Sequence, residues 1–300
     1  TDPALMRTRM VAHHRRGDLA LSHDRLNDAQ REYQAAMELA AMLARPQPHS
    51  ALAQNDLAAS WNRLGKVWGK LGQLTEAAAA HQQAIAVIQK LTLQGSLDYQ
   101  SQHHLAFSFD WAGKVALWQC QLIEAAAAHQ QAKTALAQLV QNDPLNVQWQ
   151  RDLAGCWNSL GDVERLQGHA AEAITHYQQA FAIVETLVMQ NPLNAQWQGD
   201  LAYCWNRLGK GFLRQGQAQE SAEAHRRALG IMETLAERDR QNASWQKEVA
   251  FCWNSLGKVA ARQGQPLEAV TAHQRALTML QVLAQRDPQN MGTQHDLAFT

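Results

Sequence analysis

The sequence predicts an all-α repeat protein built from pairs of helices. The main observation is a ten-residue stretch, residues 152–161, whose copies recur every 48 residues along the chain. Trp157, Trp205 and Trp253 mark three successive copies, and Trp61 and Phe109 hold the same place in two earlier ones. The second observation is composition, because Pro is scarce with 7 residues while Ala and Gln are abundant, which favours helix. A fixed period of this length is typical of a solenoid, in which each repeat contacts mainly its neighbours.

The period divides the 300 residues into one continuous array. The predicted repeats are 1–51, which diverges from the others, then 52–99, 100–147, 148–195, 196–243 and 244–291, with 292–300 beginning a further one. In the divergent first repeat, His13 and Arg16 stand where Trp61 and Leu64 stand in the second. This repeat is therefore expected to be a polar cap or to pair differently from the rest.

Each repeat is expected to hold two long helices. Leu153, Trp157 and Leu160 form an apolar row on the first helix, and Gly168 ends it in a left-handed conformation. The second helix carries apolar residues at helical spacing from residue 173 to residue 188 and closes before a Pro. Cys120 replaces the turn glycine in one repeat, so we expect that turn to be the most irregular.

Charge and cysteine content exclude several classes of function. Lys plus Arg equals Asp plus Glu at 27 each, so the whole chain has no field that would attract nucleic acid or an anionic membrane. The four cysteines are Cys120, Cys156, Cys204 and Cys252. Equivalent positions in neighbouring repeats lie roughly 10 to 20 Å apart, too far for a disulfide, so free thiols and a cytoplasmic location are expected. The chain lacks a run of about 18 apolar residues and a signal peptide, so no membrane span is predicted.

The pattern resembles the tetratricopeptide repeat family over residues 17–300. Trp157, Leu160 and Gly161, followed by Ala173, Tyr177 and Ala180, fit the family signature. The resemblance implies an α-solenoid of antiparallel helix pairs, and the repeats here are longer than the usual length of about 34 residues. Long repeats of this type resemble those of bacterial multidomain proteins, in which the array docks another protein. The chain is therefore expected to be part of a larger multidomain protein.

The resemblance also implies a binding site. In such arrays one face of the first helix lines a concave groove, where Asn side chains of some relatives hold an extended peptide. The expected protein- or peptide-binding residues are Asn62, Lys66, Asn158, Tyr203, Asn206, Lys210, Phe251, Asn254 and Lys258. An amide both donates to and accepts from a peptide backbone, and the lysines would add a preference for acidic ligands. The alternative is an ordinary solvated face that tolerates Asn after Trp.

Two further columns of residues suit the protein core better than a site. His81, His129, His225 and His273 occupy the place of Tyr177, and one His per repeat cannot supply three or four ligands to a single metal ion. They are interpreted as core imidazoles, with a pH effect on stability left open. A second Trp column, which includes Trp197, is expected to seal the junction with the preceding repeat.

The sequence therefore predicts an interaction scaffold or sensor that binds a protein or an extended peptide. It contains no catalytic motif or metal-ligand cluster, and no enzyme activity, cofactor or metal is expected. The alternative is a structural spacer or a self-association scaffold that binds no peptide. RNA binding is a third class, which the zero net charge and the acidic Asp110 and Asp162 on the expected binding face disfavour.

Overall fold

The structure, a computed structural model, describes residues 2–23, 25–93 and 98–286. These residues form twelve α-helices and no strand. The helices are α1 (Pro3–Ser22), α2 (Leu26–Ala44), α3 (Ala51–Lys70), α4 (Leu74–Leu93), α5 (Tyr99–Trp118), α6 (Leu122–Asn142), α7 (Val147–Gln167), α8 (Ala170–Gln190), α9 (Ala195–Arg214), α10 (Ala218–Arg238), α11 (Ala243–Arg262) and α12 (Pro266–Arg286). The predicted all-α solenoid class is confirmed. The helix expected over 292–300 lies outside the described residues.

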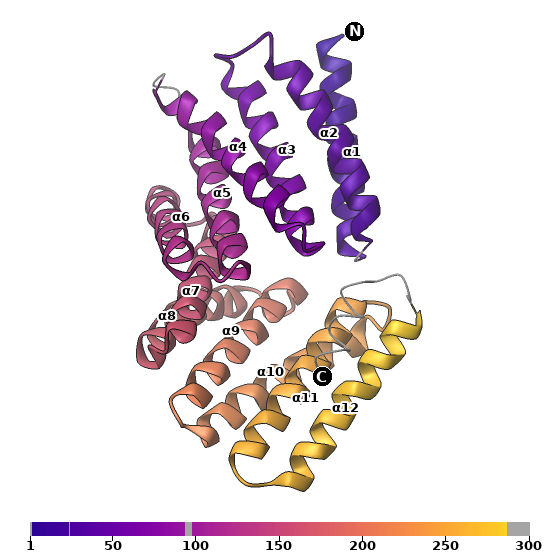
Figure 1. Cartoon of the computed structure of the whole chain (residues 1–300), viewed down its shortest axis with the longest axis vertical. Coiled ribbons are helices and arrows are strands. Elements are labelled where there is room, and N and C mark those ends of the chain that lie inside the picture. The colour runs from indigo at the N-terminus through magenta and orange to yellow at the C-terminus, as the bar shows by residue number, and fades with distance from the viewer. Residues whose placement is uncertain (1, 24, 94–97, 287–300) are drawn as a thin grey trace. The chain divides into compact units, whose positions relative to one another are not determined.

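The chain divides into two compact units, Thr1–Cys156 and Trp157–Thr300, which are described separately below as unit 1 and unit 2. Each unit consists of antiparallel helix pairs (Figure 1). The odd-numbered helices, from α1 to α11, correspond to the predicted first helix of each repeat and are called first helices. The even-numbered helices are called second helices.

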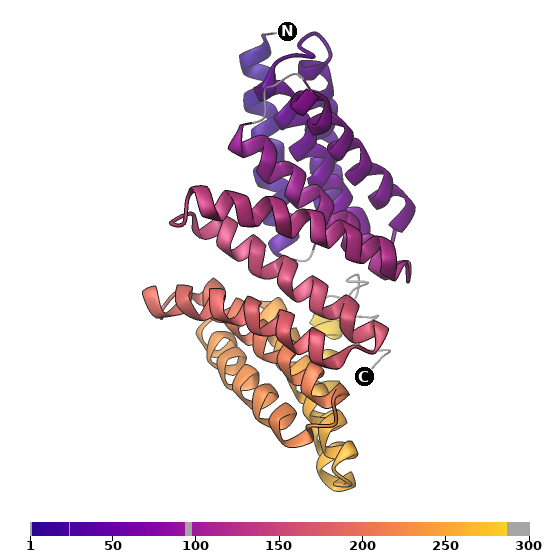
Figure 2. The ribbon, with the colours of Figure 1, turned by 90° about the vertical axis from the view of Figure 1, so that its left-hand side faces the viewer.

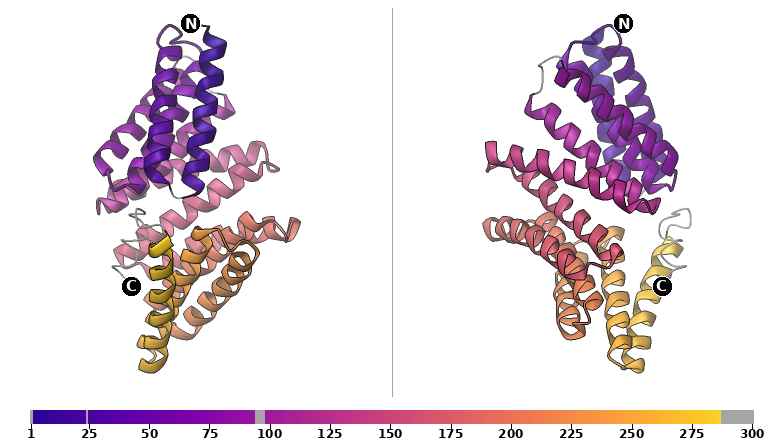
Figure 3. Two further views of the ribbon diagram at one scale, coloured as in Figure 1. Left: turned by 90° about the vertical axis from the view of Figure 1, so that its right-hand side faces the viewer. Right: turned by 60° about the vertical axis from the view of Figure 1, so that its left-hand side comes forward.

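The core of each unit lies between successive helices. In unit 1, α2 packs against α1 and α3, and α4 packs against α3 and α5 (Figure 2). Tyr33 and Leu64 are fully buried at one such junction. In unit 2, α9 packs against α8 and α10, and α11 packs against α10 and α12 (Figure 3). Met232, Val249 and Cys252 form part of the core there. These buried apolar residues are the ones that the helical periodicity predicts.

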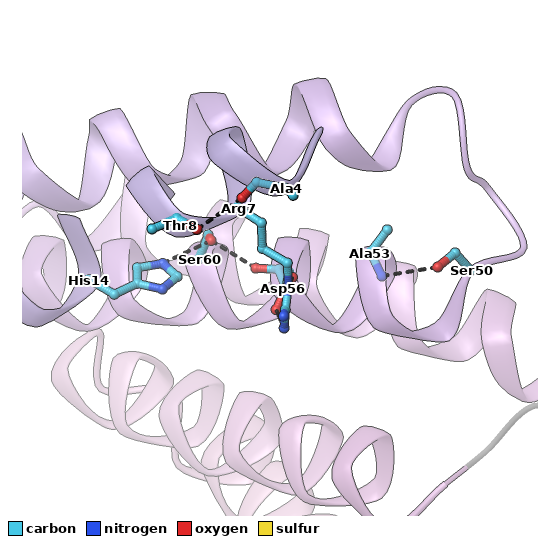
Figure 4. Close-up of polar contacts among 8 residues, drawn as sticks. All are labelled: Ala4, Arg7, Thr8, His14, Ser50, Ala53, Asp56 and Ser60. Carbon is cyan, nitrogen blue, oxygen red and sulfur yellow. Dashed lines mark hydrogen bonds and ion pairs between the residues drawn. The ribbon is translucent and has the colours of Figure 1, made fainter. Parts of the chain in front are cut away.

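Side-chain caps fix where the first helices begin. The Asn194 carboxamide oxygen accepts from the backbone N–H of Trp197 at 3.1 Å, and Asn242 accepts from that of Trp245 at 3.2 Å. In unit 1, Ser50 caps α3 by accepting from the backbone N–H of Ala53 (Figure 4). These bonds satisfy N–H groups that have no partner within the helix. The capping residue lies three positions before the tryptophan of the second Trp column. This tryptophan therefore stands in the first turn of its helix.

Glycine in the middle of the first helix lets the second helix pack closely. A Cβ atom on Gly209 would lie 2.6 Å from Nε2 of His225, and one on Gly65 would lie 2.7 Å from Nε2 of His81. Real Cβ atoms do not approach neighbouring atoms so closely, so any larger residue would push the imidazole out of its buried place. The Leu-Gly element of the repeat is thus a packing requirement.

The turn at Cys120 has the same backbone pattern as the glycine turns. Cys120 has φ 62°, the only positive φ among the described non-glycine residues. Its N–H donates to the Leu117 carbonyl at 3.0 Å, and the equivalent bond from Gly72 to the Gly69 carbonyl measures 3.1 Å. The expectation that this turn is the most irregular is wrong, because Cys120 adopts the left-handed conformation and leaves the turn unchanged.

We expect Gly209→Ala to destabilise the protein by about 1–3 kcal/mol, because the new methyl group overpacks against His225. Gly230→Ala is the matched control, because Gly230 lies in a helix with open space where the added methyl group would stand. That substitution should stabilise the protein by up to about 1 kcal/mol. Urea unfolding measures both values, and equal effects of the two substitutions would contradict the packing argument.

We expect Cys120→Gly to stabilise the protein by about 1 kcal/mol, because glycine adopts positive φ without steric cost. The reverse substitution, Gly72→Cys, should destabilise it by a similar amount, since Gly72 has φ 77°. Thermal unfolding under reducing conditions compares the two variants with the parent. An unchanged midpoint for both would show that the left-handed cysteine carries no strain.

Candidate functional site

The asparagines that follow the first Trp column are buried. Asn62 is 2% exposed, Asn158 is 4% exposed and Asn206 is 7% exposed, and Asn254 is half-buried. The expectation that these amides face solvent in a groove is therefore wrong for Asn62, Asn158 and Asn206. Their direction, about 100° around the helix from the Trp, is the direction in which the neighbouring helices pack.

Asn62 and Asn206 each join three helices, whereas Asn158 on α7 bonds to Cys204 on α9 at 3.5 Å and its buried Oδ1 has no hydrogen-bond partner among the described residues. In unit 2, Oδ1 of Asn206 on α9 lies 2.9 Å from Nδ1 of His225 on α10, and Nδ2 of Asn206 lies 3.3 Å from Sγ of Cys252 on α11. In unit 1, Oδ1 of Asn62 lies 3.1 Å from Nδ1 of His81 and accepts from Oγ of Ser108 at 3.0 Å. We call this arrangement a polar rung. It supplies the hydrogen bonds that a buried amide needs and fixes how far one repeat is shifted against the next.

Two further rungs of unit 1 use other polar residues. His14 takes the place of the asparagine on α1, and its Nε2 lies 3.0 Å from Oγ of Ser60 (Figure 4). Asp110 takes that place on α5, where it lies 3.0 Å from Nδ1 of His129 and 2.5 Å from Nζ of Lys114. Burial would raise the pKa of Asp110, but the charge of Lys114 and the hydrogen bond with His129 outweigh it and hold the pKa below its usual range.

Two repeats have tyrosine on the second helix and use a different partner. The Tyr177 hydroxyl donates to Oδ1 of Asp162 at 2.8 Å, and Arg207 pairs with Oδ2 of the same carboxylate at 3.1 Å. The Tyr33 hydroxyl donates to Asp18 at 2.7 Å in the same way. The longer tyrosine reaches one helical turn beyond the rung, to the position that is lysine in the other repeats. The pairs by repeat are Tyr33 with Asp18, His81 with Lys66, His129 with Lys114, Tyr177 with Asp162, His225 with Lys210, and His273 with Lys258.

The other predicted binding residues are more accessible than the asparagines. Tyr203 is 40% exposed, Lys210 and Lys258 are exposed, and Lys66 and Phe251 are half-buried. On α9, the guanidinium of Arg207 lies 4.5 Å from the centre of the Tyr203 ring. The exposed part of the predicted site in unit 2 is therefore aromatic and cationic.

A pocket in unit 2 brings Lys210 and Lys258 together. It has a volume of about 290 Å³ and lies among α7, α9, α10 and α11. Its lining residues are Arg165, Lys210, Leu213, Arg214, His225, Ser255, Lys258 and Arg262. We call it the cationic pocket. The sequence prediction missed Arg165, Arg214 and Arg262, although Arg214 and Arg262 are 48 residues apart and each is the last residue of a first helix.

The cationic pocket has more positive charge than its surroundings neutralise. In the described part of the chain, none of Lys210, Arg214, Lys258 and Arg262 forms an ion pair with a carboxylate. Lys210 keeps contact with solvent, yet the protein atoms around its ammonium group and the charges of Arg207 and Arg165 lower its pKa to about 8. The zero net charge of the chain thus conceals a strongly cationic site.

The described residues offer little for metal chemistry, and three of the four thiols, Cys156, Cys204 and Cys252, are buried, whereas Cys120 is exposed. The described residues contain no group of three or more His, Cys, Asp or Glu side chains that could hold a metal ion. Burial raises the pKa of Cys204 and of Cys252 to about 12, so these thiols stay protonated at neutral pH and are poor nucleophiles. Among the helices of this part of the chain, none is both long enough and apolar enough to cross a bilayer.

The antiparallel helix pairs and the buried repeat signature define the class of helical-repeat proteins. Residues 57–92 match the family model described as "Tetratricopeptide repeat", and the predicted resemblance is confirmed. No curated protein matches the chain.

Several solved structures share the fold. BtubC (BKLC) from P. vanneervenii has a TM-score of 0.63 at 17% identity, with 86% of this chain and 92% of that chain covered. A Rap protein complexed with competence and sporulation factor has a TM-score of 0.59 at 12% identity, covering 95% and 79% of the two chains. The TPR-like repeats of a putative kinesin light chain from P. anserina give 0.52 at 19% identity, covering 78% and 98%. At these identities the likeness shows the fold alone.

The buried imidazoles of the rungs should make stability depend on pH. Burial lowers the pKa of His81 and of His225 to about 3, against 6.5 in the unfolded chain. The unfolded chain therefore binds more protons below about pH 6.5, so the stabilisation is complete above that pH and is lost as the pH falls towards 3. Each imidazole should contribute up to about 1.4 kcal/mol of lost stability per pH unit within this window.

Urea unfolding at pH 7, 6 and 5 measures this dependence. His225→Gln should be less stable than the parent at pH 7 but show a shallower loss between pH 7 and pH 5, because one titrating imidazole is gone. A variant with the same pH slope as the parent would show that His225 is already protonated in the folded state.

Proposed function

We propose that this chain is a protein-interaction module that binds an acidic, extended segment of a partner protein on the first helices of unit 2. The observation that carries the proposal is the cationic pocket, where Lys210 and Lys258 face the same space without a carboxylate partner. The fold supports a general role in protein binding, since the tetratricopeptide repeat presents such surfaces to other proteins. We infer no enzyme activity and no cofactor.

The arrangement along each helix supports a ligand that crosses the helices. Tyr203, Arg207 and Lys210 stand at helical spacing on α9, and Phe251 and Lys258 hold equivalent places on α11. Both α9 and α11 therefore offer an aromatic ring followed two turns later by a cation. Neighbouring first helices lie roughly 10 to 20 Å apart, so an extended chain that rises about 3.3 Å per residue would meet a new helix every three to six residues.

This proposal replaces the role first expected for the asparagines. In the folded protein, Asn158 and Asn206 form buried contacts with Cys204 and Cys252. These contacts stabilise the packing of the helices that carry the binding surface. Recognition is assigned to the exposed cations and aromatic rings. In the alternative of a structural spacer, the cationic pocket would stay empty and no saturable binding would be measured.

A fluorescein-labelled dodecapeptide of alternating Glu and Gly should bind the protein at low salt, and the matching Gln peptide should not. Lys210→Glu with Lys258→Glu should weaken binding at least about tenfold, because attraction becomes repulsion. Arg238→Glu with Arg240→Glu is the matched control, since it makes the same change of charge at the exposed α10–α11 turn. Fluorescence anisotropy measures the dissociation constants. Equal binding of the two peptides, or equal affinity of the two double variants, would refute the proposal.

A further inference from the structure

The cationic pocket has the chemistry of a phosphate site. Resting on the proposed function, we propose that the pocket receives a phosphorylated serine or threonine side chain of the bound peptide, so that phosphorylation of the partner controls its capture. Arg165 comes from α7, Lys210 and Arg214 come from α9, and Lys258 and Arg262 come from α11. Three guanidinium and two ammonium groups thus face one space of about 290 Å³, and no carboxylate lines it.

The number of cations favours a phosphate over a carboxylate. A phosphorylated side chain carries a charge of about −1.5 to −2 at neutral pH and three strong acceptor oxygens. A glutamate carries a single charge on two oxygens, so it would leave most of these cations unpaired. Arginine presents its N–H groups in a planar fork that matches phosphate oxygens. Cations that converge from three helices onto one group are therefore better satisfied by a phosphate.

A donor of the pocket lacks its own partner. Nε of Arg165 is buried and has no hydrogen-bond partner among the described residues. The guanidinium of Arg165 pairs with Asp162 at 3.5 Å, but this carboxylate also accepts from Tyr177 at 2.8 Å and pairs with Arg207 at 3.1 Å. Arg165 thus shares this carboxylate with Tyr177 and Arg207, and its Nε remains a donor without a partner among the described residues.

The equivalent place in unit 1 shows why only unit 2 is assigned this role. Ser255 lines the cationic pocket, and the residue 144 positions earlier is Trp111. Lys66 and Lys114 place their ammonium groups 5.5 and 4.7 Å from the centre of the Trp111 ring, and Lys114 also pairs with Asp110 at 2.5 Å. The two lysines of unit 1 are therefore already engaged. In unit 2, the small Ser255 leaves the corresponding space open.

The tryptophan at the equivalent place in unit 1 suggests an uncharged substitution that should block the cationic pocket. Ser255→Trp places the ring of unit 1 into the cationic pocket and leaves every charge unchanged. Three versions of one acidic dodecapeptide, with phosphoserine, glutamate or serine at the central position, are titrated against the parent and this variant by fluorescence anisotropy. The phosphoserine peptide should bind the parent at least tenfold more tightly than the glutamate peptide. The variant should lose that preference and bind the phosphoserine and glutamate peptides with equal affinity; a preference that survives in the folded variant would contradict the assignment of the phosphate to this pocket.

A charge-matched comparison separates the pocket from general attraction. Arg214→Gln with Arg262→Gln should also remove the preference for phosphoserine, whereas Arg238→Gln with Arg240→Gln should keep it, although both pairs remove two charges. Circular dichroism confirms that each variant is folded. Should the blocked variant fail to fold, the arginine pairs give the same test.

The pH profile gives an independent signature. The affinity for the phosphoserine peptide should rise about three- to tenfold from pH 5.5 to pH 7, because the second ionisation of a phosphate ester lies near pH 6. The affinity for the glutamate peptide should show no such rise. This peptide therefore also controls for any loss of folded protein at acidic pH. The charged and titratable groups that face the pocket or its lysines are Asp162, Arg165, Arg207, Lys210, Arg214, His225, Glu248, Lys258 and Arg262. Burial lowers the pKa of the single imidazole, His225, to about 3, so it does not titrate in this range.

The outcomes distinguish this inference from the proposed function. If the phosphoserine and glutamate peptides bind the parent equally, the phosphate assignment is wrong, while the module for acidic segments stands. If none of the three peptides binds, both proposals fail. Full competition by free O-phosphoserine at the concentration of the bound peptide would also overturn the assignment, because the site would then recognise a small anion and not a peptide.

Discussion

The packing of successive repeats depends on a buried polar side chain at the same place in the first helices α1 to α9. Asn206 contacts His225 on the second helix of its own pair and Cys252 on the following first helix. An unpaired amide in that position would cost about 1–3 kcal/mol, so the three helices are held in one register. The 48-residue period, the histidine column and the cysteine column are all parts of this single arrangement. Gly209 belongs to it as well, since it admits the imidazole.

The residue on the second helix also determines the charge that the first helix presents. A histidine bonds to the rung and leaves the position one turn further along to a lysine, such as Lys210. A tyrosine reaches that position itself and donates to a carboxylate there, as Tyr177 does to Asp162. Each unit therefore presents one aspartate and then two lysines at this position. The core and the binding surface cannot vary independently, because a change from His to Tyr calls for a change from Lys to Asp.

The sequence predicted the helix pairs, the turn glycines and the core histidines, because each follows from local periodicity or backbone geometry. It failed on the direction of Asn62 and Asn206. A position 100° from the Trp can face solvent or the next helix, and only the packing of three helices decides between them. The cationic pocket also could not be predicted by comparing equivalent positions of the repeats. Arg165 is not in the column of Arg214 and Arg262, and it joins them only through the packing of α7 near α9 and α11.

Stability and recognition therefore use different polar residues on the same helix. The rung amides Asn62 and Asn206 are buried, neutral and hydrogen-bonded, whereas the cations Lys210, Arg214, Lys258 and Arg262 are exposed and form no ion pair with a carboxylate in the described part of unit 2. Burial of the ammonium group lowers the pKa of Lys210, and the charges of Arg207 and Arg165 lower it further, so an anion that enters would offset this repulsion as well as add attraction. In unit 1, burial and the charges of Lys70 and Lys114 likewise lower the pKa of Lys66 to about 8, but Asp110 pairs with Lys114 and the Trp111 ring lies against both Lys66 and Lys114. The two units thus differ in whether a tryptophan of the chain itself lies against their lysines or the corresponding space remains open to a partner.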